Sequence, residues 1–358
     1  HDGDIACPPM ACQSQQHPRP QSRQWPLVLL FGLIRRNCTG TVLRGRIDRT
    51  HYVGRAAAAD VDRVLSEQTG VPLGAIERDE KEILLNLEET LRSEVIGQEE
   101  AIHDVAAALR RARTAVGSKA RPIGSFLFLG PTGSGKTHTA KMLAKHYFGG
   151  AEVMVRFDMT AFALPETEGS FVARATLAIE EHPFSLLFFD ELEKADRVIW
   201  NTLLQVLDEG HLTTRTGQTI SFKNTIIIAT SNAGTALVQE RPATTKDELQ
   251  KYLIDTHVFS PEFLNRFDDI VLFHPLSRAD ARKVTMLLLN DLNARLLSER
   301  NISVEITDTL IDAIVTSGFD AENGARALRR AIEETVENAV AEAVLRDQVA
   351  PGARLRIL

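Results

Sequence analysis

The sequence of 358 residues predicts an α/β protein: a five-stranded parallel sheet sandwiched by helices, followed by a smaller, mostly helical C-terminal domain. Three observations lead to this prediction. Short apolar runs alternate with stretches of helical periodicity, a glycine-rich loop joins the first run to a helix, and helical periodicity dominates after residue 276. Strands that alternate with helices are typical of a parallel sheet covered on both faces.

The chain before the sheet is predicted in two parts. Residues 1–55 form an unassigned, largely disordered basic segment, because the first 24 residues are rich in Gln, Pro, Ser and Arg. Its apolar run from Trp25 is about half the roughly 20 residues that a membrane span needs. Residues 56–94 are predicted to form a helical connector, since apolar residues recur at helical spacing over 58–72 and again over 80–97. A further helix is predicted over 99–116.

Five apolar runs are predicted to form the sheet of a large nucleotide-binding domain over residues 95–275. They are 125–130, 153–159, 185–191, 224–232 and 269–274. Each is short and continuously apolar, as strands buried on both faces of a parallel sheet are. The small domain, residues 276–358, is predicted to contain helices over 279–301, 308–318 and 324–347, with short strands at 303–307 and 353–358.

Charge and cysteine content narrow the partners and the compartment. The formal net charge is −7, and because residues 1–56 carry eight Arg against three Asp, the body that follows is strongly acidic. Nucleic-acid binding needs a basic surface, so no nucleic-acid partner is expected. All three cysteines lie within the first 38 residues, so a disulfide framework for the main fold is excluded. A cytoplasmic location is expected, and membrane association is not.

The sequence GPTGSGKT is a candidate phosphate-binding loop. It comprises Gly130, Pro131, Thr132, Gly133, Ser134, Gly135, Lys136 and Thr137, and His138 follows it. It fits the pattern G-x-x-x-x-G-K-[ST] in full and lies between a predicted strand and a predicted helix. This structural context distinguishes a phosphate-binding loop from a glycine-rich turn that matches the pattern by chance. Its backbone N–H groups and the helix N-terminus suit phosphate oxygens. We therefore expect ATP as ligand, with Lys136 on the β- and γ-phosphates and the Thr137 hydroxyl on Mg²⁺.

The run LLFFDE places Asp190 and Glu191 at the end of a predicted buried strand. Adjacent carboxylates at such a position are costly unless a cation or a water molecule uses them. We expect Asp190 to serve the Mg²⁺ site and Glu191 to polarise the attacking water as general base. The strand over 224–232 ends in Thr230, Ser231 and Asn232, and a short polar side chain there can position the same water.

Seven motifs follow one another along the chain. They are VIGQEEAI (95–102), GPTGSGKT (130–137), LLFFDELEKAD (186–196), LLQVLDEGHLT (203–213), NTIIIATSN (224–232), FSPEFLNRFDDIVLFHPL (259–276) and GARALRRAIEE (324–334). In this order they resemble the Clp family of AAA+ protein unfoldases, above all the second ATPase ring of the ClpB/ClpC branch. The likeness runs from about residue 56 to the last residue. It implies an AAA+ P-loop NTPase with a Clp-type small domain, Mg²⁺-dependent ATP hydrolysis, a homo-oligomeric ring (a hexamer) and protein clients.

The resemblance also assigns roles to four single residues. Arg266 matches the arginine finger, which completes the catalytic site of the neighbouring subunit, and Arg326 matches the second sensor, by which the small domain reports the nucleotide state. Ile96 matches a residue beside adenine, and Asn232 matches the first sensor. From the residues alone, the favoured interpretation of Arg266 is a surface arginine paired with Asp268 or Asp269.

The sequence departs from the family pattern between the second and third predicted strands. There the family carries a pore loop whose aromatic residue, typically in Gly-Tyr-Val-Gly, grips the translocating polypeptide, whereas this segment is shorter and has no Tyr. Phe171 is the nearest substitute, and Phe162 lies further upstream. Three alternatives remain: Phe171 belongs to a reduced pore loop, the loop is lost and no protein is threaded, or Phe171 packs within its own domain.

Residues 232–263 lack the Ile/Val-Gly-Phe/Leu tripeptide by which protease-coupled relatives dock, so no proteolytic chamber is expected as a partner. The leading hypothesis is an oligomeric ATPase that remodels or unfolds proteins as a Clp-type chaperone. One alternative is an AAA+ switch that acts on a dedicated partner without threading it. Another is a regulatory subunit that binds nucleotide but does little hydrolysis. The presence of Lys136, Glu191 and Arg266 argues against this alternative.

Overall fold

The computed structural model describes residues 73–114, 121–214, 217–241, 243–320, 323–346, 349 and 352–357. The predicted basic segment over 1–55, with its three cysteines, and the predicted helix over 58–72 lie outside these residues. The first described helix, α3 (Leu73–Glu94), begins seven residues before the predicted stretch over 80–97.

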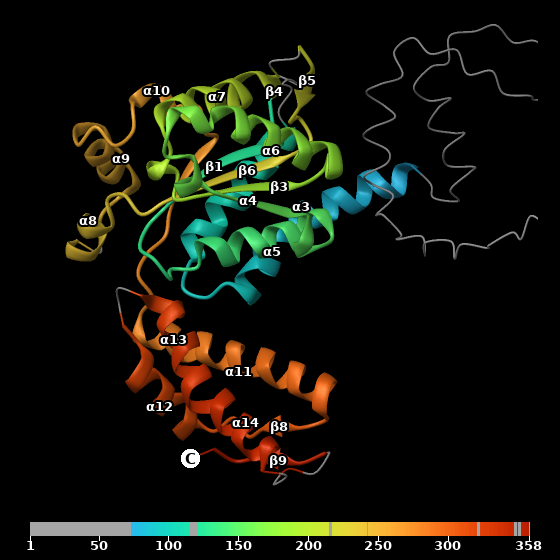
Figure 1. Ribbon diagram of the computed structural model, residues 1–358, viewed down its shortest axis with the longest axis vertical. Helices are drawn as coiled ribbons and strands as arrows, with labels where there is room; N and C mark the ends of the chain where they lie inside the picture. Colours follow the sequence, from blue (N-terminus) through green and yellow to red (C-terminus); the bar gives the residue numbers. More distant parts are fainter. Residues whose placement is uncertain are drawn as a thin grey trace, which may run out of the picture. The chain divides into compact units, whose positions relative to one another are not determined.

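A five-stranded sheet forms the centre of the large domain (Figure 1). The order of its strands is β2-β3-β6-β1-β7. Its strands are β1 (Gly124–Leu129), β2 (Met154–Asp158), β3 (Leu186–Asp190), β6 (Ile226–Ser231) and β7 (Asp269–Leu272). Every pairing in the sheet is parallel. The predicted fold class is therefore confirmed, and each of the five predicted runs overlaps one strand.

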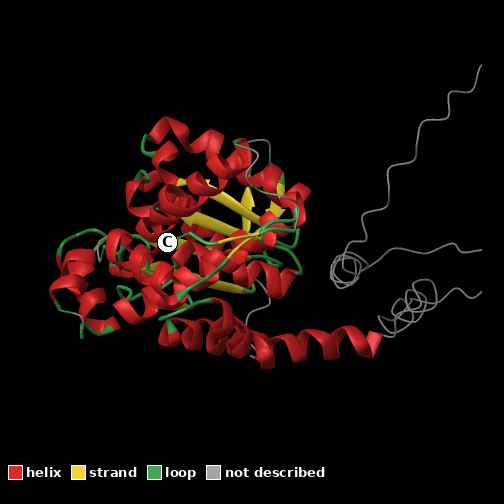
Figure 2. Ribbon diagram, turned by 90° about the horizontal axis from the view of Figure 1, so that it is seen from below, coloured by secondary structure: helices red, strands yellow, loops and turns green. Residues whose placement is uncertain are grey.

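Helices cover both faces of this sheet because successive side chains of a strand point to opposite sides. Phe126 and Phe128 of β1 share a core with α3, α4 (Glu99–Thr114) and α5 (Lys136–Phe148). Leu127 and Leu129 share the other core with α6 (Glu168–Glu181) and α7 (Arg197–Glu209). Figure 2 shows the strands enclosed between helices on two sides.

The remaining elements of the large domain are short. They are the helices α8 (Thr235–Glu240), α9 (Lys246–Asp255) and α10 (Pro261–Leu264), the antiparallel pair β4 (His211–Thr213) and β5 (Thr219–Ser221), and 3₁₀ turns at Ala151–Val153, Met159–Phe162, Pro165–Thr167 and Leu192–Lys194. Within the described part of the chain, no helix is both long enough and apolar enough to cross a membrane.

The C-terminal region is mostly helical, as predicted. It contains α11 (Arg278–Arg300), α12 (Asp308–Gly318), α13 (Gly324–Ile332) and α14 (Asn338–Leu345), with β8 (Ser303–Val304) paired in parallel to β9 (Arg354–Leu355). Its own core includes Leu289, Leu310 and Leu328. A π-helical stretch over Glu333–Glu337 separates α13 from α14, so the single helix predicted over 324–347 is two helices.

Glu88 fastens α3 to α4 on the face of the sheet that carries the glycine-rich loop's helix. One carboxylate oxygen lies 2.8 Å from Nη2 of Arg110, and the other lies 3.0 Å from Nδ1 of His103 and 2.9 Å from Nη2 of Arg92. The hydrogen bond from Arg110, followed by that from His103, lowers the pKa of Glu88 from 4.5 to about 2. The carboxylate therefore stabilises the folded chain while it is ionised.

Removing this carboxylate should have an effect that depends on pH. Because the pKa of Glu88 is lower in the folded chain, its stabilisation is complete above about pH 5 and disappears as pH falls towards 2. Glu88→Gln should lower the free energy of unfolding at neutral pH by about 1–2 kcal/mol, less than the full shift implies because the site is partly solvated. Urea unfolding at about pH 7 and pH 3.5 measures this, with the exposed Glu89→Gln as control. A deficit of equal size at both pH values would contradict it.

Candidate nucleotide-binding and catalytic site

The glycine-rich loop connects β1 to α5 and packs against the start of α13. Gly133 and Gly135 have φ angles of +76° and +105°, which L side chains rarely adopt. A Cβ on Gly133 would lie 2.0 Å from the carbonyl oxygen of Asn323. The Ala325 N–H donates to the carbonyl oxygen of Gly133 at 3.1 Å. The conformation of the loop is thus held from the helix that carries Arg326.

A methyl group at Gly133 should disturb this loop through both strain and collision. Gly133→Ala is expected to weaken the binding of a fluorescent ATP analogue by about tenfold or more, since such backbone strain alone costs about 1–3 kcal/mol. The matched control is Gly217→Ala, where φ is +82° and nothing lies within 4 Å of the added Cβ. Equal nucleotide affinity in the two variants would show that the contact with Asn323 does not support the loop.

Lys136, the first residue of α5, is almost completely enclosed, with 9% of its surface exposed. Its ammonium donates to the carbonyl oxygens of Gly130 at 2.6 Å and Pro131 at 2.9 Å, and to Oδ1 of Asn232 at 3.0 Å. Burial lowers the pKa of Lys136 from 10.5 to about 8, and the nearby Asp190 carboxylate opposes this shift. These contacts hold the cation beside the loop that is suited to phosphate.

Gln98 supports the loop from behind, a role that the sequence reasoning missed. The side chain is 2% exposed, and its amide N–H groups donate to the carbonyl oxygens of Ser134 at 3.0 Å and His274 at 2.8 Å. Its Oε1 accepts from the His274 N–H at 3.1 Å. A buried, fully bonded amide fixes the loop to the segment after β7. Gln98 stands in the VIGQ motif, two residues after Ile96, and that position was the available signal.

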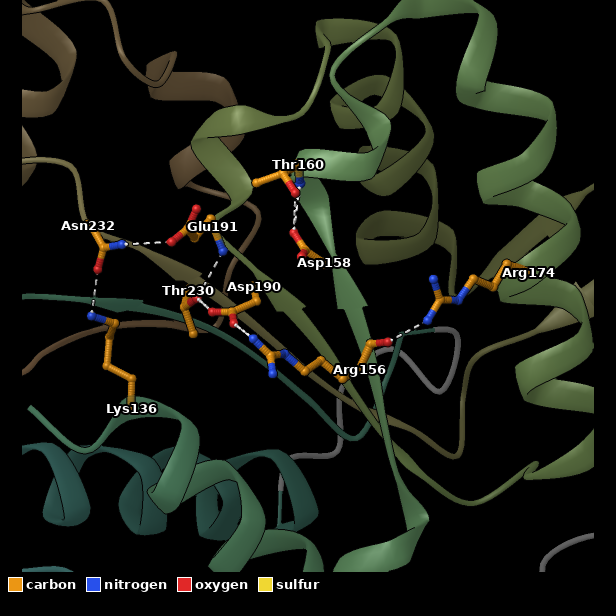
Figure 3. A network of polar contacts seen from close by, with 9 residues as sticks. All are labelled: Lys136, Arg156, Asp158, Thr160, Arg174, Asp190, Glu191, Thr230 and Asn232. Atoms are coloured by element: carbon orange, nitrogen blue, oxygen red, sulfur yellow. Dashed lines mark hydrogen bonds and ion pairs between the residues drawn. The ribbon is translucent and has the colours of Figure 1, made fainter. Parts of the chain in front are cut away.

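The two carboxylates at the end of β3 lie in different surroundings (Figure 3). Asp190 accepts a hydrogen bond from the Thr230 hydroxyl at 2.6 Å and forms an ion pair with Arg156. Glu191 follows in the left-handed conformation, with φ at 57°, and its N–H donates to the Thr230 hydroxyl oxygen at 3.2 Å. A non-glycine residue held in this region is strained, and such residues gather at functional sites.

Asn232 lies between Lys136, the candidate phosphate-binding residue, and Glu191, the candidate general base. Its Oδ1 faces the ammonium of Lys136 at 3.0 Å, and its Nδ2 lies 3.5 Å from Oε1 of Glu191. An ammonium only donates hydrogen bonds and a carboxylate only accepts them. The amide therefore has to turn its oxygen to Lys136 and its nitrogen to Glu191, as it does here. Asn232 therefore orients the carboxylate relative to the loop.

One pocket of about 760 Å³ brings together most of the residues singled out in the sequence. Those that line it are Ile96, Thr132, Gly133, Ser134, Gly135, Lys136, Thr137, His138, Asp190, Glu191, Asn232 and Arg326. Gly130 and Pro131 are not in the lining, but their carbonyl oxygens accept hydrogen bonds from the ammonium of Lys136. Sequence reasoning did not identify three further basic residues of the lining, Lys145, Arg156 and Arg329.

The lining fits a magnesium nucleotide. The hydroxyl of Thr137 and the carboxylate of Asp190 are oxygen donors, which Mg²⁺ prefers, usually together with phosphate oxygens. The loop's N–H groups, Lys136 and Arg326 suit the phosphate chain. An apolar part of the wall, formed by Val95, Ile96, Leu276, Val284, Leu287 and Leu288, suits a flat base.

Arg266 lies outside the lining of this pocket. Its guanidinium is 3.0 Å from Oδ1 of Asp208 and 3.8 Å from Oε1 of Glu262, with 36% of the side chain exposed. The alternative pairing with the two following aspartates is wrong, because Asp268 accepts hydrogen bonds from the Ser125 N–H and hydroxyl. Asp269 instead forms ion pairs with Lys246 and Arg111. The structure therefore separates Arg266 from the pocket of its own chain.

Phe171 is a core residue, not part of a loop. It lies on α6 with 1% of its surface exposed, and its ring centroid is 5.3 Å from that of Phe162, 5.9 Å from Phe157 and 6.0 Å from Phe189. Of the three alternatives, packing within its own domain is the one that the structure supports, and the reduced pore loop built on Phe171 is wrong. The large apolar side chains that this segment exposes are instead Leu164 and Leu177.

Comparisons with known proteins match two parts of the chain to family models and most of the chain to curated relatives. Residues 121–270 match the model of the AAA domain (Cdc48 subfamily), and residues 276–357 match that of the C-terminal, D2-small domain, of ClpB protein. The chain is 39% identical over 323 residues to the ATP-dependent Clp protease ATP-binding subunit ClpC of Staphylococcus aureus (strain USA300), covering 83% of this chain and 39% of that protein. It is 40% identical over 316 residues to the Chaperone protein ClpB of Vibrio vulnificus (strain YJ016), covering 84% and 36%.

The chain thus spans under two fifths of the length of these curated relatives. Its two family matches follow the two structural regions, the first on the five-stranded sheet and the second on the helical C-terminal part. The family assignment agrees with the parallel sheet, with the glycine-rich loop before α5 and with the acidic end of β3. It also agrees with the two relatives at this level of identity. The chain belongs to the Clp family of AAA+ ATPases.

Proposed function

We propose that this chain hydrolyses ATP with Mg²⁺ and uses the reaction to remodel proteins as a Clp-type chaperone ATPase. The observation that carries the proposal is the shared pocket of Lys136, Thr137, Asp190 and Glu191. Bound Mg²⁺ would neutralise phosphate charge, with Thr137 and Asp190 as its protein ligands. Glu191, oriented by Asn232, would accept the proton of the attacking water.

Arg266 supports a reaction completed between subunits. Its side chain is partly exposed and does not line the pocket of its own chain, which supports a role at a neighbour's pocket in a head-to-tail ring. A guanidinium brought to the γ-phosphate stabilises the charge of the transition state. We propose a homo-oligomeric ring, with six as the number of subunits and the cytoplasm as its location.

Mixing two inactive variants tests both hydrolysis and action between subunits. Arg266→Ala keeps its own base but lacks the finger, and Glu191→Gln keeps the finger but lacks the base. Each alone should lose at least about 100-fold in Mg²⁺-dependent phosphate release. An equal mixture should recover roughly a quarter of wild-type activity, the share of interfaces that combine both intact groups in a head-to-tail ring. No recovery on mixing, with assembly intact, would contradict the assignment.

A second candidate is a switch that acts on a dedicated partner without threading it. It is favoured by the burial of both aromatic residues of the segment 159–181, Phe162 at 4% and Phe171 at 1% exposure. ATP hydrolysis measured with and without an unfolded model protein separates the two. Stimulation by the unfolded protein supports remodelling of general clients. Hydrolysis that ignores it supports the dedicated partner.

A further inference from the structure

Both oxygens of the Asp190 carboxylate are already engaged in this structure. Oδ1 accepts the hydrogen bond of the Thr230 hydroxyl at 2.6 Å, and Oδ2 faces Nη2 of Arg156 in an ion pair (Figure 3). The Asp190 side chain is 19% exposed, so this pair is only partly solvated. Any cation that approaches Asp190 from the pocket must displace or share these partners.

Arg156 is the cation that contacts Asp190 directly, because Lys136 is committed elsewhere. A lysine ammonium has three donors, and those of Lys136 are directed to Gly130, Pro131 and Asn232. Among the described residues, no other basic side chain forms an ion pair with Asp190. The direct ion pair of Asp190 therefore comes from the edge strand β2, whereas Lys136 of the glycine-rich loop acts on Asp190 through its charge without a direct contact.

The guanidinium of Arg156 is free to leave while its backbone stays in place. The side chain is 55% exposed, whereas the backbone pairs with Phe188 of β3 and its carbonyl oxygen accepts from Nη2 of Arg174 at 2.9 Å. A second carboxylate, Asp158, stands two residues along the same strand and so on the same side. Its pKa is lowered by hydrogen bonds from Thr160 and, to a smaller extent, by the charge of Arg156.

We propose that Arg156 is an internal competitor of Mg²⁺ for Asp190. It occupies the carboxylate in the nucleotide-free site and is displaced when metal arrives together with nucleotide. Free Mg²⁺ would gain only one protein carboxylate at this site, that of Asp190. Because this carboxylate is already paired with the guanidinium of Arg156, the metal alone binds weakly. A magnesium nucleotide brings its own phosphate ligands and adds contacts to the loop, which offset the loss of the ion pair. This inference rests on the proposed nucleotide site and adds to it an order of loading.

The test is metal binding without nucleotide. Mn²⁺ is titrated into the nucleotide-free full chain. Electron paramagnetic resonance measures the concentration of Mn²⁺ that remains free, which gives the dissociation constant. Arg156→Gln should bind Mn²⁺ about three- to tenfold more tightly than wild type, in keeping with the modest strength of a partly exposed ion pair. Arg156→Lys, which keeps the charge but not the fork, should fall between the two. Arg282→Gln, which removes an ion-paired arginine on α11, serves as the matched control and should equal wild type.

The gain must come from Asp190 itself, so the double variant Arg156→Gln with Asp190→Asn should lose it. The proposal is overturned if Arg156→Gln and Arg156→Lys, both folded by circular dichroism, bind Mn²⁺ no more tightly than wild type. It is also overturned if the gain survives in the double variant. Binding of a fluorescent ATP analogue to wild type is measured in parallel. Its absence would refute the proposed nucleotide site, whereas intact nucleotide binding with unchanged Mn²⁺ affinity refutes the competition alone.

Discussion

Glu191→Gln is expected to lower the rate of ATP hydrolysis by about 10²- to 10⁴-fold while leaving nucleotide affinity within a few-fold of wild type. Glutamine keeps the size of the side chain and can still bond Asn232, but it cannot accept a proton from water. The carboxylate does not hold the glycine-rich loop, whose contacts come from Gln98 and Ala325. Phosphate release and fluorescent-nucleotide binding, measured on the same preparation, separate the chemical step from binding.

Glu193 provides the internal comparison for this prediction. It lies two residues further on, and its Oε1 accepts from the Asn232 N–H at 3.2 Å, so it supports the backbone beside the site. Glu193→Gln retains a carbonyl oxygen for that bond and should keep most of the hydrolytic activity. If Glu193→Gln lost as much turnover as predicted for Glu191→Gln while Glu191→Gln stayed active, the general base would be Glu193.

The strands of the sheet were predictable because a strand that is buried on both faces is a continuous run of apolar residues in the sequence. LLFF before Asp190 and IIIA before Thr230 cannot face water on either side, and the structure buries all eight of these residues. The pair β4 and β5 was not predictable in this way, because each strand has only three residues and only the middle residue is buried, so neither forms an apolar run. The π-helical stretch over Glu333–Glu337 also escaped prediction, because it continues the helical periodicity on either side.

The candidate site divides in the same way. Residues grouped in one motif, such as Lys136 with Thr137 or Asp190 with Glu191, are visible in the sequence because spacing alone identifies them. Contacts that join distant segments are not. Arg156 meets Asp190 across 34 positions and Gln98 meets His274 across 176, and the pairing of strands and loops in space decides both. Sequence spacing therefore predicted most of the polar residues that line the pocket, but not the distant residues that pair with them.

The burial of Phe171 could not be settled from sequence either, because an aromatic residue near a glycine fits a loop as well as a helix. In the structure, α6 begins at Glu168 and turns Phe171, Ala175, Ala178 and Ile179 towards the sheet. This spacing of three and four residues is that of one helix face. It ties Phe171 to the same core as Phe189, the residue before Asp190.

Phe171→Ala is accordingly expected to destabilise the domain by about 3–5 kcal/mol, the usual cost of removing a buried aromatic ring. Three aromatic neighbours, Phe157, Phe162 and Phe189, would line the space left behind. Urea or thermal unfolding measures the loss. Leu177→Ala, which truncates a 54% exposed side chain on the same helix, should change stability by no more than about 0.5 kcal/mol.

Phe171→Leu separates this structural role from contact with a client. Leucine fills much of the ring's space, so most of the stability should return, and ATP hydrolysis with and without an unfolded protein should match wild type. If Phe171→Ala were as stable as wild type and lost only the response to unfolded protein, the ring would have to face a client. A large loss of stability in Phe171→Ala, with a normal response in Phe171→Leu, fixes Phe171 as part of the core that supports β3.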